Sequence, residues 1–175
     1  MSTNIFIVDD HTEIAHLLSK YLNRLPGLAV CGIAASGEEA LDQLPKLAVD
    51  LVLIDLSLPD IRGDELVKKL LVCYPDLPCL ILSGYLNEEL VQAALSAGAR
   101  GYLVKINPAE FPEAIQRALN NEIYLSPKVR MQLPRVDDSY NKRCSSCRSS
   151  KVCSLACVSA ANSPCSPTGC SSSAA

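Results

Sequence analysis

The chain has 175 residues, of which 49% are hydrophobic and 20% are charged, and its formal net charge at pH 7 is −3. This balance predicts one folded domain with an appendage and excludes a chain that is disordered throughout. Its apolar runs are only as long as strands and its N-terminus lacks the regions of a secretory signal, so we expect a cytoplasmic protein without membrane contact.

Five short apolar runs divide the first 104 residues. They cover residues 5–8, 28–34, 51–54, 79–82 and 101–104. Near-continuous apolar runs of this length are typical of parallel strands in a sheet that is covered on both faces.

Helical patterns follow each of these runs. In the first helix, apolar residues recur with the spacing of one helix face, at Ile14, Leu17, Leu18, Tyr21, Leu22 and Leu25. The second begins at a capping box of Ser36 and Glu39 and ends near Pro45. The third and fourth carry their apolar faces within 66–71 and 90–95.

The fifth helix is expected to have Asn107 as its N-cap and Pro108 in its first turn. Its predicted buried residues are Phe111, Ile115 and Leu119. Five strand–helix alternations predict an α/β fold with a doubly wound, five-stranded parallel sheet.

Polar side chains follow four of the five predicted strands. They are Asp9 and Asp10 after the first, Asp55 after the third, Ser83 after the fourth and Lys105 after the fifth. Ligands of doubly wound sheets bind beyond the carboxyl ends of the strands, so we expect these five side chains to meet at one edge.

The chemistry of this set indicates phosphoryl transfer. Three close carboxylates repel one another unless a cation lies among them, and oxygen ligands suit Mg²⁺. Lys105 and the Ser83 hydroxyl would hold phosphoryl oxygens, with Asp55 as the nucleophile. Each residue alone is more simply a helix cap, a turn residue or a solvated cation, but their shared position favours a site. His11 is expected to be a polar residue at the start of the first helix, because Mg²⁺ prefers oxygen.

Four segments together resemble the receiver domain of response regulators, in the style of the NarL/FixJ-like branch. They are Ile-Val-Asp-Asp at 7–10, Leu-Val-Leu-Ile-Asp-Leu-Ser-Leu-Pro-Asp-Ile-Arg-Gly at 51–63, Leu-Ile-Leu-Ser-Gly at 80–84, and Ala-Gly-Ala-Arg-Gly-Tyr-Leu-Val-Lys at 97–105. The resemblance covers about residues 3–130 and implies a flavodoxin-like, CheY-like fold.

The resemblance also assigns roles to the residues. It implies that Asp55 takes a phosphoryl group from the phosphohistidine of a histidine kinase, and that the protein is not a conventional enzyme. The metal ligands would be Asp9, Asp10, Asp55 and the backbone carbonyl of Ser57, with Mg²⁺ as the ion. Lys105 would pair with the phosphoryl group, Ser83 would bond to it on switching, and Tyr102 would move into the space that Ser83 leaves.

Partners follow from the resemblance as well. The kinase would dock near the first helix and the loops around Lys105, and phosphorylation would favour a homodimer through the last helices. Two other classes fit less well. A phosphohydrolase of the haloacid dehalogenase type needs Asp-x-Asp on its first strand, where this chain has adjacent Asp9 and Asp10. A flavodoxin-like flavin binder needs a phosphate loop there, and these acids would repel a phosphate.

The composition changes near residue 138. Residues 1–138 hold 12 Lys and Arg against 19 Asp and Glu, a net charge of −7, which does not indicate a nucleic-acid binder, whereas 139–175 hold four basic residues and no acids. Six of the nine cysteines lie in this last segment among many serines. We therefore expect a receiver domain at 1–125, a linker at 126–138 and a Cys/Ser-rich tail at 139–175.

Three interpretations of the tail stay open: a largely disordered segment, a frameshifted or truncated product, and a metal or redox module. How the protein passes its signal on also stays open. The protein is either a stand-alone phosphorelay receiver or a transcription regulator that has lost a LuxR-type helix-turn-helix domain here. DNA is a partner only in the second case.

Overall fold

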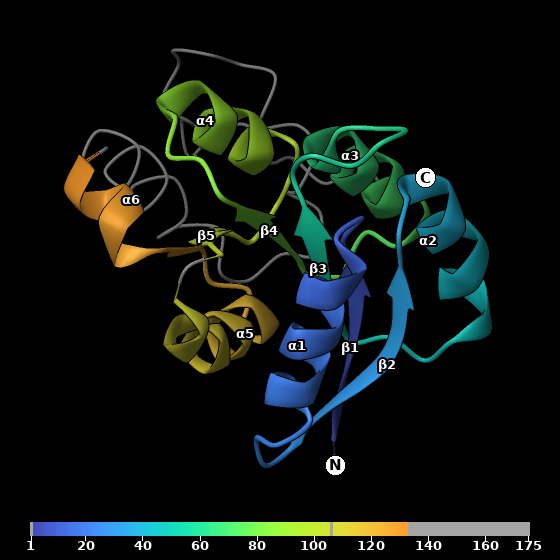
Figure 1. Cartoon of the computed structure of the whole chain (residues 1–175). Helices are drawn as coiled ribbons and strands as arrows, with labels where there is room; N and C mark the ends of the chain where they lie inside the picture. The colour runs from blue at the N-terminus through green and yellow to red at the C-terminus, as the bar shows by residue number, and fades with distance from the viewer. Residues whose placement is uncertain (1, 106, 133–175) are drawn as a thin grey trace, which may run out of the picture. The chain divides into compact units, whose positions relative to one another are not determined.

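The computed structural model describes residues 2–105 and 107–132 (Figure 1). Its strands are β1 (Thr3–Val8), β2 (Leu28–Ala34), β3 (Leu51–Asp55), β4 (Cys79–Ser83), β5 (Gly101–Val104) and β6 (Tyr124–Leu125). Its α-helices are α1 (Thr12–Leu22), α2 (Gly37–Gln43), α3 (Gly63–Cys73), α4 (Glu88–Ser96), α5 (Phe111–Leu119) and α6 (Pro127–Gln132). Within these ranges, no helix is both long and apolar enough to cross a bilayer.

The strands form one parallel sheet in the order β2-β1-β3-β4-β5-β6. The order reverses between β1 and β3, which makes their carboxyl ends the switch point where such sheets bind ligands. The predicted doubly wound α/β fold is therefore confirmed, and all five predicted strands are present.

The sheet differs from the five-stranded prediction by a sixth, two-residue strand. Residues Tyr124 and Leu125 pair with Gly101 and Tyr102 of β5. A side chain at Gly101 would collide with the carbonyl of Tyr124, so this glycine permits the pairing. A two-residue strand is too short to show any periodicity, which is why the sequence did not reveal it.

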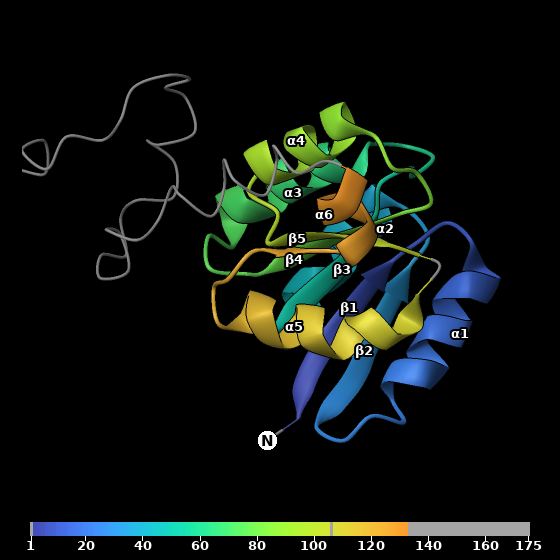
Figure 2. The same ribbon diagram turned by 90° about the vertical axis from the view of Figure 1, so that its left-hand side faces the viewer.

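Helices cover both faces of the sheet (Figure 2), and each face carries its own cluster of buried apolar residues. On one face α1 and α5 pack through residues such as Leu22 and Ile115. On the other face the helices α2, α3, α4 and α6 contribute residues such as Ala40, Leu70 and Val91. With apolar residues buried on both faces, the sheet matches the continuous apolar runs seen in the sequence.

The second helix begins as predicted, and the fifth begins at the predicted place but with a 3-10 turn and without a side-chain cap. The Ser36 hydroxyl accepts a hydrogen bond from the Glu39 amide at 3.2 Å, which caps α2. Asn107 instead precedes a 3-10 turn at Pro108–Glu110 and makes no cap with its side chain. The side-chain amide of Asn107 donates instead to the Glu110 carboxylate at 2.8 Å. The α-helix itself starts at Phe111.

The segment predicted as a linker begins with a short helix. Val129 of α6 is buried, the Ser126 hydroxyl donates to Glu110 at 2.5 Å, and Arg130 donates to the carbonyl of Leu125 at 3.0 Å. These contacts hold residues 126–132 against the domain. The rest of the predicted linker and the tail at 139–175, with its six cysteines, lie outside the described residues, so their boundaries stay predictions.

Candidate functional site

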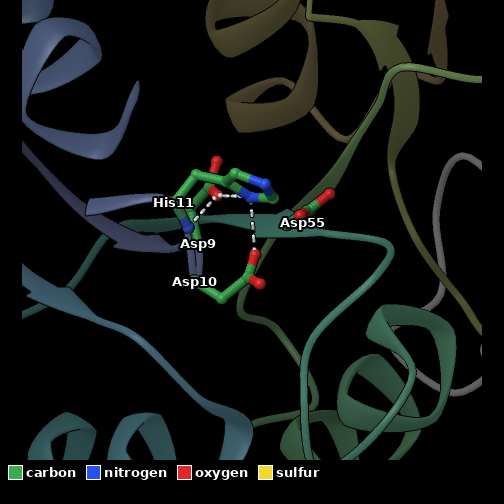
Figure 3. Close-up of side chains that lie close together, drawn as sticks. All are labelled: Asp9, Asp10, His11 and Asp55. Carbon is green, nitrogen blue, oxygen red and sulfur yellow. Dashed lines mark hydrogen bonds and ion pairs between the residues drawn. The ribbon is translucent and has the colours of Figure 1, made fainter. Parts of the chain in front are cut away.

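The carboxyl edge of the sheet brings the predicted residues together. Asp9 and Asp10 follow β1, Asp55 ends β3 and Ser83 ends β4. Lys105 directly follows β5. Figure 3 shows the carboxylates of Asp9, Asp10 and Asp55 on the same side of this edge. The polar residues at the ends of β1, β3, β4 and β5 therefore lie at one edge of the sheet, as the sequence predicted.

The three carboxylates differ in their exposure to solvent. Asp9 is 0% and Asp55 4% exposed, whereas Asp10 is an exposed residue. A ligand atom from each of them, together with one from His11, lies within 4.8 Å of the others. Buried carboxylates this close repel each other strongly and need a positive charge nearby.

Lys105 supplies one such charge. Its Nζ lies 2.7 Å from Oδ2 of Asp9 and 3.1 Å from Oδ2 of Asp55, and its side chain is 17% exposed. The lysine therefore joins the ends of β1, β3 and β5 through two largely buried ion pairs. It holds Oδ2 of each carboxylate, while Oδ1 of Asp9 accepts a hydrogen bond from the backbone amide of His11 at 3.0 Å.

The pKa of Asp55 is raised above its ordinary value. Burial is the main cause, and the nearby Asp9 carboxylate adds to it. The Lys105 ammonium and a hydrogen bond from the backbone N–H of Ser57 act in the opposite direction. Ser57 thus contacts the Asp55 carboxylate through its backbone amide, while the role of its carbonyl as a metal ligand stays a prediction.

The loop after β3 is fixed by contacts that the sequence did not predict. The Asp60 carboxylate accepts hydrogen bonds from the amides of Gly37 at 3.0 Å and Glu38 at 2.8 Å, so it caps the start of α2. A side chain at Gly63 would collide with the Asp55 carbonyl, so the glycine allows α3 to begin directly against the end of β3. Asp60 and Gly63 lie in the quoted receiver-like segment, but only the folded chain shows what they touch.

Ser83 and Tyr102 are both buried, with 1% and 0% exposure. The Ser83 hydroxyl accepts from the Tyr85 amide at 3.0 Å, and the Tyr102 hydroxyl donates to the Tyr85 carbonyl at 2.9 Å. Burial raises the pKa of Tyr102, and a hydrogen bond with Ser83 opposes that shift. The sequence prediction made the entry of Tyr102 depend on movement of Ser83. In this structure Tyr102 is already inside, because the Tyr85 carbonyl gives its hydroxyl a partner there.

His11 lies directly before α1, as expected for a polar residue at the helix start. Its Nδ1 is 2.8 Å from Oδ1 of Asp10 and 3.5 Å from Oδ1 of Asp9, and its backbone amide donates to Asp9 at 3.0 Å. The imidazole therefore faces the carboxylates, which the sequence did not predict.

A hollow of about 400 Å³ adjoins the loop between β3 and α3. Its lining residues are Leu56, Ser57, Leu58, Arg62, Tyr85 and Leu90. Because they come from the β3–α3 loop, the β4–α4 loop and α4, the hollow lies beside the end of β3 that carries Asp55.

Comparisons with known proteins agree on one family. The response regulator receiver domain matches residues 5–116. The response regulator GacA of Pseudomonas viridiflava is 34% identical over 142 residues, which make up 77% of this chain and 66% of GacA. The transcriptional activator DevR/DosR of Mycobacterium tuberculosis is 41% identical over 113 residues, or 64% of this chain and 52% of that protein. The chain thus spans about half to two thirds of these curated relatives.

Solved structures show the same relationship. A two-component response regulator of the LuxR family from Aurantimonas sp. SI85-9A1 superposes with a TM-score of 0.74 and 28% identity, covering 79% of this chain and 99% of its own. A CheY-like receiver domain protein from Methanospirillum hungatei JF-1 has a TM-score of 0.63 and 33% identity, and the match covers 69% of this chain and 96% of that protein. The chain belongs to the response regulator receiver family, and its relatives are two-component response regulators of the NarL/LuxR branch.

Proposed function

We propose that Asp55 accepts a phosphoryl group from the phosphohistidine of a partner histidine kinase in a Mg²⁺-dependent reaction, and that the domain then switches conformation. One observation carries this proposal. The carboxylate of Asp55 ends β3 at the switch point of the sheet, with the Lys105 ammonium 3.1 Å from its Oδ2 and the carboxylate of Asp9 beside it. A receiver domain implies a kinase partner, and it acts on itself rather than as a conventional enzyme.

The transfer itself needs little from the protein beyond position and charge. An oxygen of Asp55 attacks phosphorus as the bond from phosphorus to the kinase imidazole breaks. The electron pair of that bond stays on the imidazole nitrogen, which takes a proton from water, and Asp55 becomes an acyl phosphate. Lys105 supports this step because its ammonium already lies against Asp55 and can pair with a phosphoryl oxygen.

The donor set fits Mg²⁺. Carboxylate oxygens come from Asp9, Asp10 and Asp55, and the Ser57 carbonyl is the expected fourth ligand. A single lysine faces the two buried carboxylates, so the described site still carries excess negative charge. When bound, Mg²⁺ supplies positive charge that offsets the carboxylates and the incoming phosphoryl oxygens.

Ser83 and Tyr102 are the proposed switch residues. Both are hydrogen-bonded to the backbone of Tyr85, one through its amide and the other through its carbonyl. If the Ser83 hydroxyl turns to a phosphoryl oxygen on Asp55, it releases the Tyr85 amide and loosens the β4–α4 loop that also holds Tyr102. A local change in charge would thereby move the loop before α4.

Phosphorylation of the full chain tests the proposal. We would incubate the protein with Mg²⁺ and acetyl phosphate and measure its intact mass. The expected result is the addition of one phosphoryl group to the native chain and to Asp42→Asn, which changes an exposed carboxylate of α2, and none to Asp55→Asn. Equal addition to Asp55→Asn would refute the assignment.

The docking surface of the kinase and the output of the protein are also proposed. We propose that the kinase docks near α1, where Ile14 and Leu17 are 42% and 67% exposed, and near Lys105, in the cytoplasm. Phosphorylation is proposed to favour a homodimer, which sedimentation of the phosphorylated chain would test.

The output of the protein is proposed from a relative. DevR/DosR is named a DNA-binding activator, which favours a regulator of transcription in a longer protein over a stand-alone relay. Salt-dependent DNA binding by the full chain would exclude the relay, whereas its absence is expected both of the relay and of a regulator that has lost its DNA-binding domain.

A further inference from the structure

Ser126 lies where β5, the 3-10 turn before α5 and the start of α6 meet. The residue is fully buried and directly follows β6. Its backbone amide donates to the carbonyl of Tyr102 at 3.1 Å, and its hydroxyl donates to Oε2 of Glu110 at 2.5 Å. Its carbonyl accepts a hydrogen bond from the amide of Arg130 in α6 at 3.1 Å. The three polar groups of this buried residue therefore have partners in three different elements.

These contacts belong to a closed ring of hydrogen bonds that begins and ends on β5. From Tyr102 the ring passes through Ser126 to the carboxylate of Glu110. The other oxygen of that carboxylate, Oε1, accepts from the side-chain amide of Asn107 at 2.8 Å. The backbone amide of Asn107 donates to the carbonyl of Val104 at 3.4 Å, which closes the ring. Because hydrogen bonds to a carboxylate are stronger than neutral ones, the two bonds of Glu110 hold the ring most firmly.

The ring supports the end of β5 from which Lys105 projects. Lys105 directly follows Val104, and its Nζ lies 2.7 Å from Oδ2 of Asp9 and 3.1 Å from Oδ2 of Asp55. β6 pairs with the first half of β5, and the ring extends this support to the end that bears the lysine. A misplacement of about 1 Å can slow a reaction on the order of 100-fold, so the position of this strand end matters for any transfer to Asp55.

We propose that Ser126 is a positioning residue for the phosphoryl transfer. Through Glu110 it holds the turn after β5, and it thereby keeps the ammonium of Lys105 in place at Asp55. This inference rests on the proposed function, because it concerns the lysine of that same site. Ser126 lies beyond residues 5–116, which match the receiver domain, so a segment after the matched region contributes to the site.

Acetylation of Lys105 by acetic anhydride tests its placement without any phosphoryl transfer. The lysine is protected in the native chain, because its ammonium is largely buried in two ion pairs. We expect Ser126→Ala to raise the acetylation rate of Lys105 about 10-fold, as for loss of one hydrogen bond to a charged group. The rate at Lys69, an exposed lysine of α3, should stay unchanged. Peptide mass spectrometry measures both rates in the full chain.

The rate of phosphorylation tests whether this placement matters. With acetyl phosphate and Mg²⁺, Ser126→Ala should react about 10-fold more slowly than the native chain. Asn107→Ala opens the same ring at an exposed position and should slow the reaction as well. Glu113→Gln, an exposed change on α5 outside the ring, is the matched control and should react at the native rate. Adding Ser126→Ala to Lys105→Ala should cause no further slowing, because Ser126 acts through that lysine.

The two readouts separate this inference from the proposed function. Native protection of Lys105 in Ser126→Ala, or further slowing in the double variant, would overturn the inference. If Asp55 is phosphorylated at the same rate in all single variants of the ring, the inference fails and the proposed function stands. If the native chain is not phosphorylated but Ser126→Ala exposes Lys105, the placement by Ser126 is supported and the proposed function fails.

Circular dichroism of each variant shows whether its fold is retained. If Ser126→Ala does not fold, Asn107→Ala decides the inference by the same two rates, because its side chain is exposed. Faster acetylation of Lys105 and slower phosphorylation in Asn107→Ala would support the inference, and native values of both rates would overturn it.

Discussion

Replacing Lys105 by methionine leaves two buried carboxylates without their shared cation. The ammonium of Lys105 lies 2.7 Å from Asp9 and 3.1 Å from Asp55, and its side chain is 17% exposed. Removing one partner of a fully buried ion pair costs about 3–5 kcal/mol. Because this lysine keeps some contact with water, we expect a loss of about 2–3 kcal/mol near pH 7.5 without divalent cations.

The stability lost in Lys105→Met should grow as the pH rises. The folded-state pKa of Asp55 is already raised by burial, so its ionisation opposes folding, and stability rises as pH falls through that pKa. Lys105 counteracts this shift, so its removal raises the pKa of Asp55 further and increases the cost of ionisation. Lys105→Met should therefore be most destabilising near pH 7.5, and its cost should shrink as the pH falls toward 4 and the Asp55 carboxylate takes up its proton.

Denaturant unfolding followed by circular dichroism measures the effect. Lys69→Met, which removes an exposed lysine of α3, is the matched control and should cost less than about 0.5 kcal/mol at either pH. Adding Mg²⁺ should return part of the stability to Lys105→Met. A loss below about 1 kcal/mol near pH 7.5, or the same loss at both pH values, would refute the electrostatic account of this site.

Three further substitutions test separate contacts. Tyr102→Phe removes the 2.9 Å hydrogen bond to the Tyr85 carbonyl and should cost about 1 kcal/mol in thermal unfolding, with no change if that bond is absent. Asp60→Ala removes the cap of α2 and should cost about 1 kcal/mol. Burial acts to raise the pKa of Asp60, but hydrogen bonds from backbone amides, those of Gly37 and Glu38 first, together lower it. The cost should therefore disappear as pH falls through that pKa, and a constant cost would contradict this. Gly63→Ala forces a side chain against the Asp55 carbonyl and should cost more than about 2 kcal/mol, whereas a neutral result would show that α3 can shift.

The strands were the most predictable part of the fold. Each predicted strand lies within its observed bounds, because a sheet covered on both faces requires continuous apolar runs. The fifth helical segment starts at the predicted place, but the predicted side-chain cap was wrong, since Asn107 bonds to the Glu110 side chain and a 3-10 turn replaces the first α-helical turn. The sequence did not predict β6 or α6, because strands of two residues and helices of six are too short to show a periodic pattern of apolar residues.

The sequence predicted which residues lie at the site better than it predicted which atoms they contact. Strand order places Asp9, Asp55 and Lys105 at one edge, and any parallel sheet of this winding would do so. The bridge from Lys105 to two carboxylates depends on side-chain conformations that no spacing reports. The same holds for the imidazole of His11, whose role was judged from its residue type rather than from its direction.

Borohydride trapping tests the central claim most directly. Reduction of an aspartyl phosphate leaves homoserine at the phosphorylated position, which peptide mass spectrometry can locate. We predict that the full chain, treated with acetyl phosphate and Mg²⁺ and then with borohydride, contains homoserine at position 55. Homoserine at another aspartate, or at none while control receivers are labelled, would contradict the assignment of Asp55 as the phosphoryl acceptor.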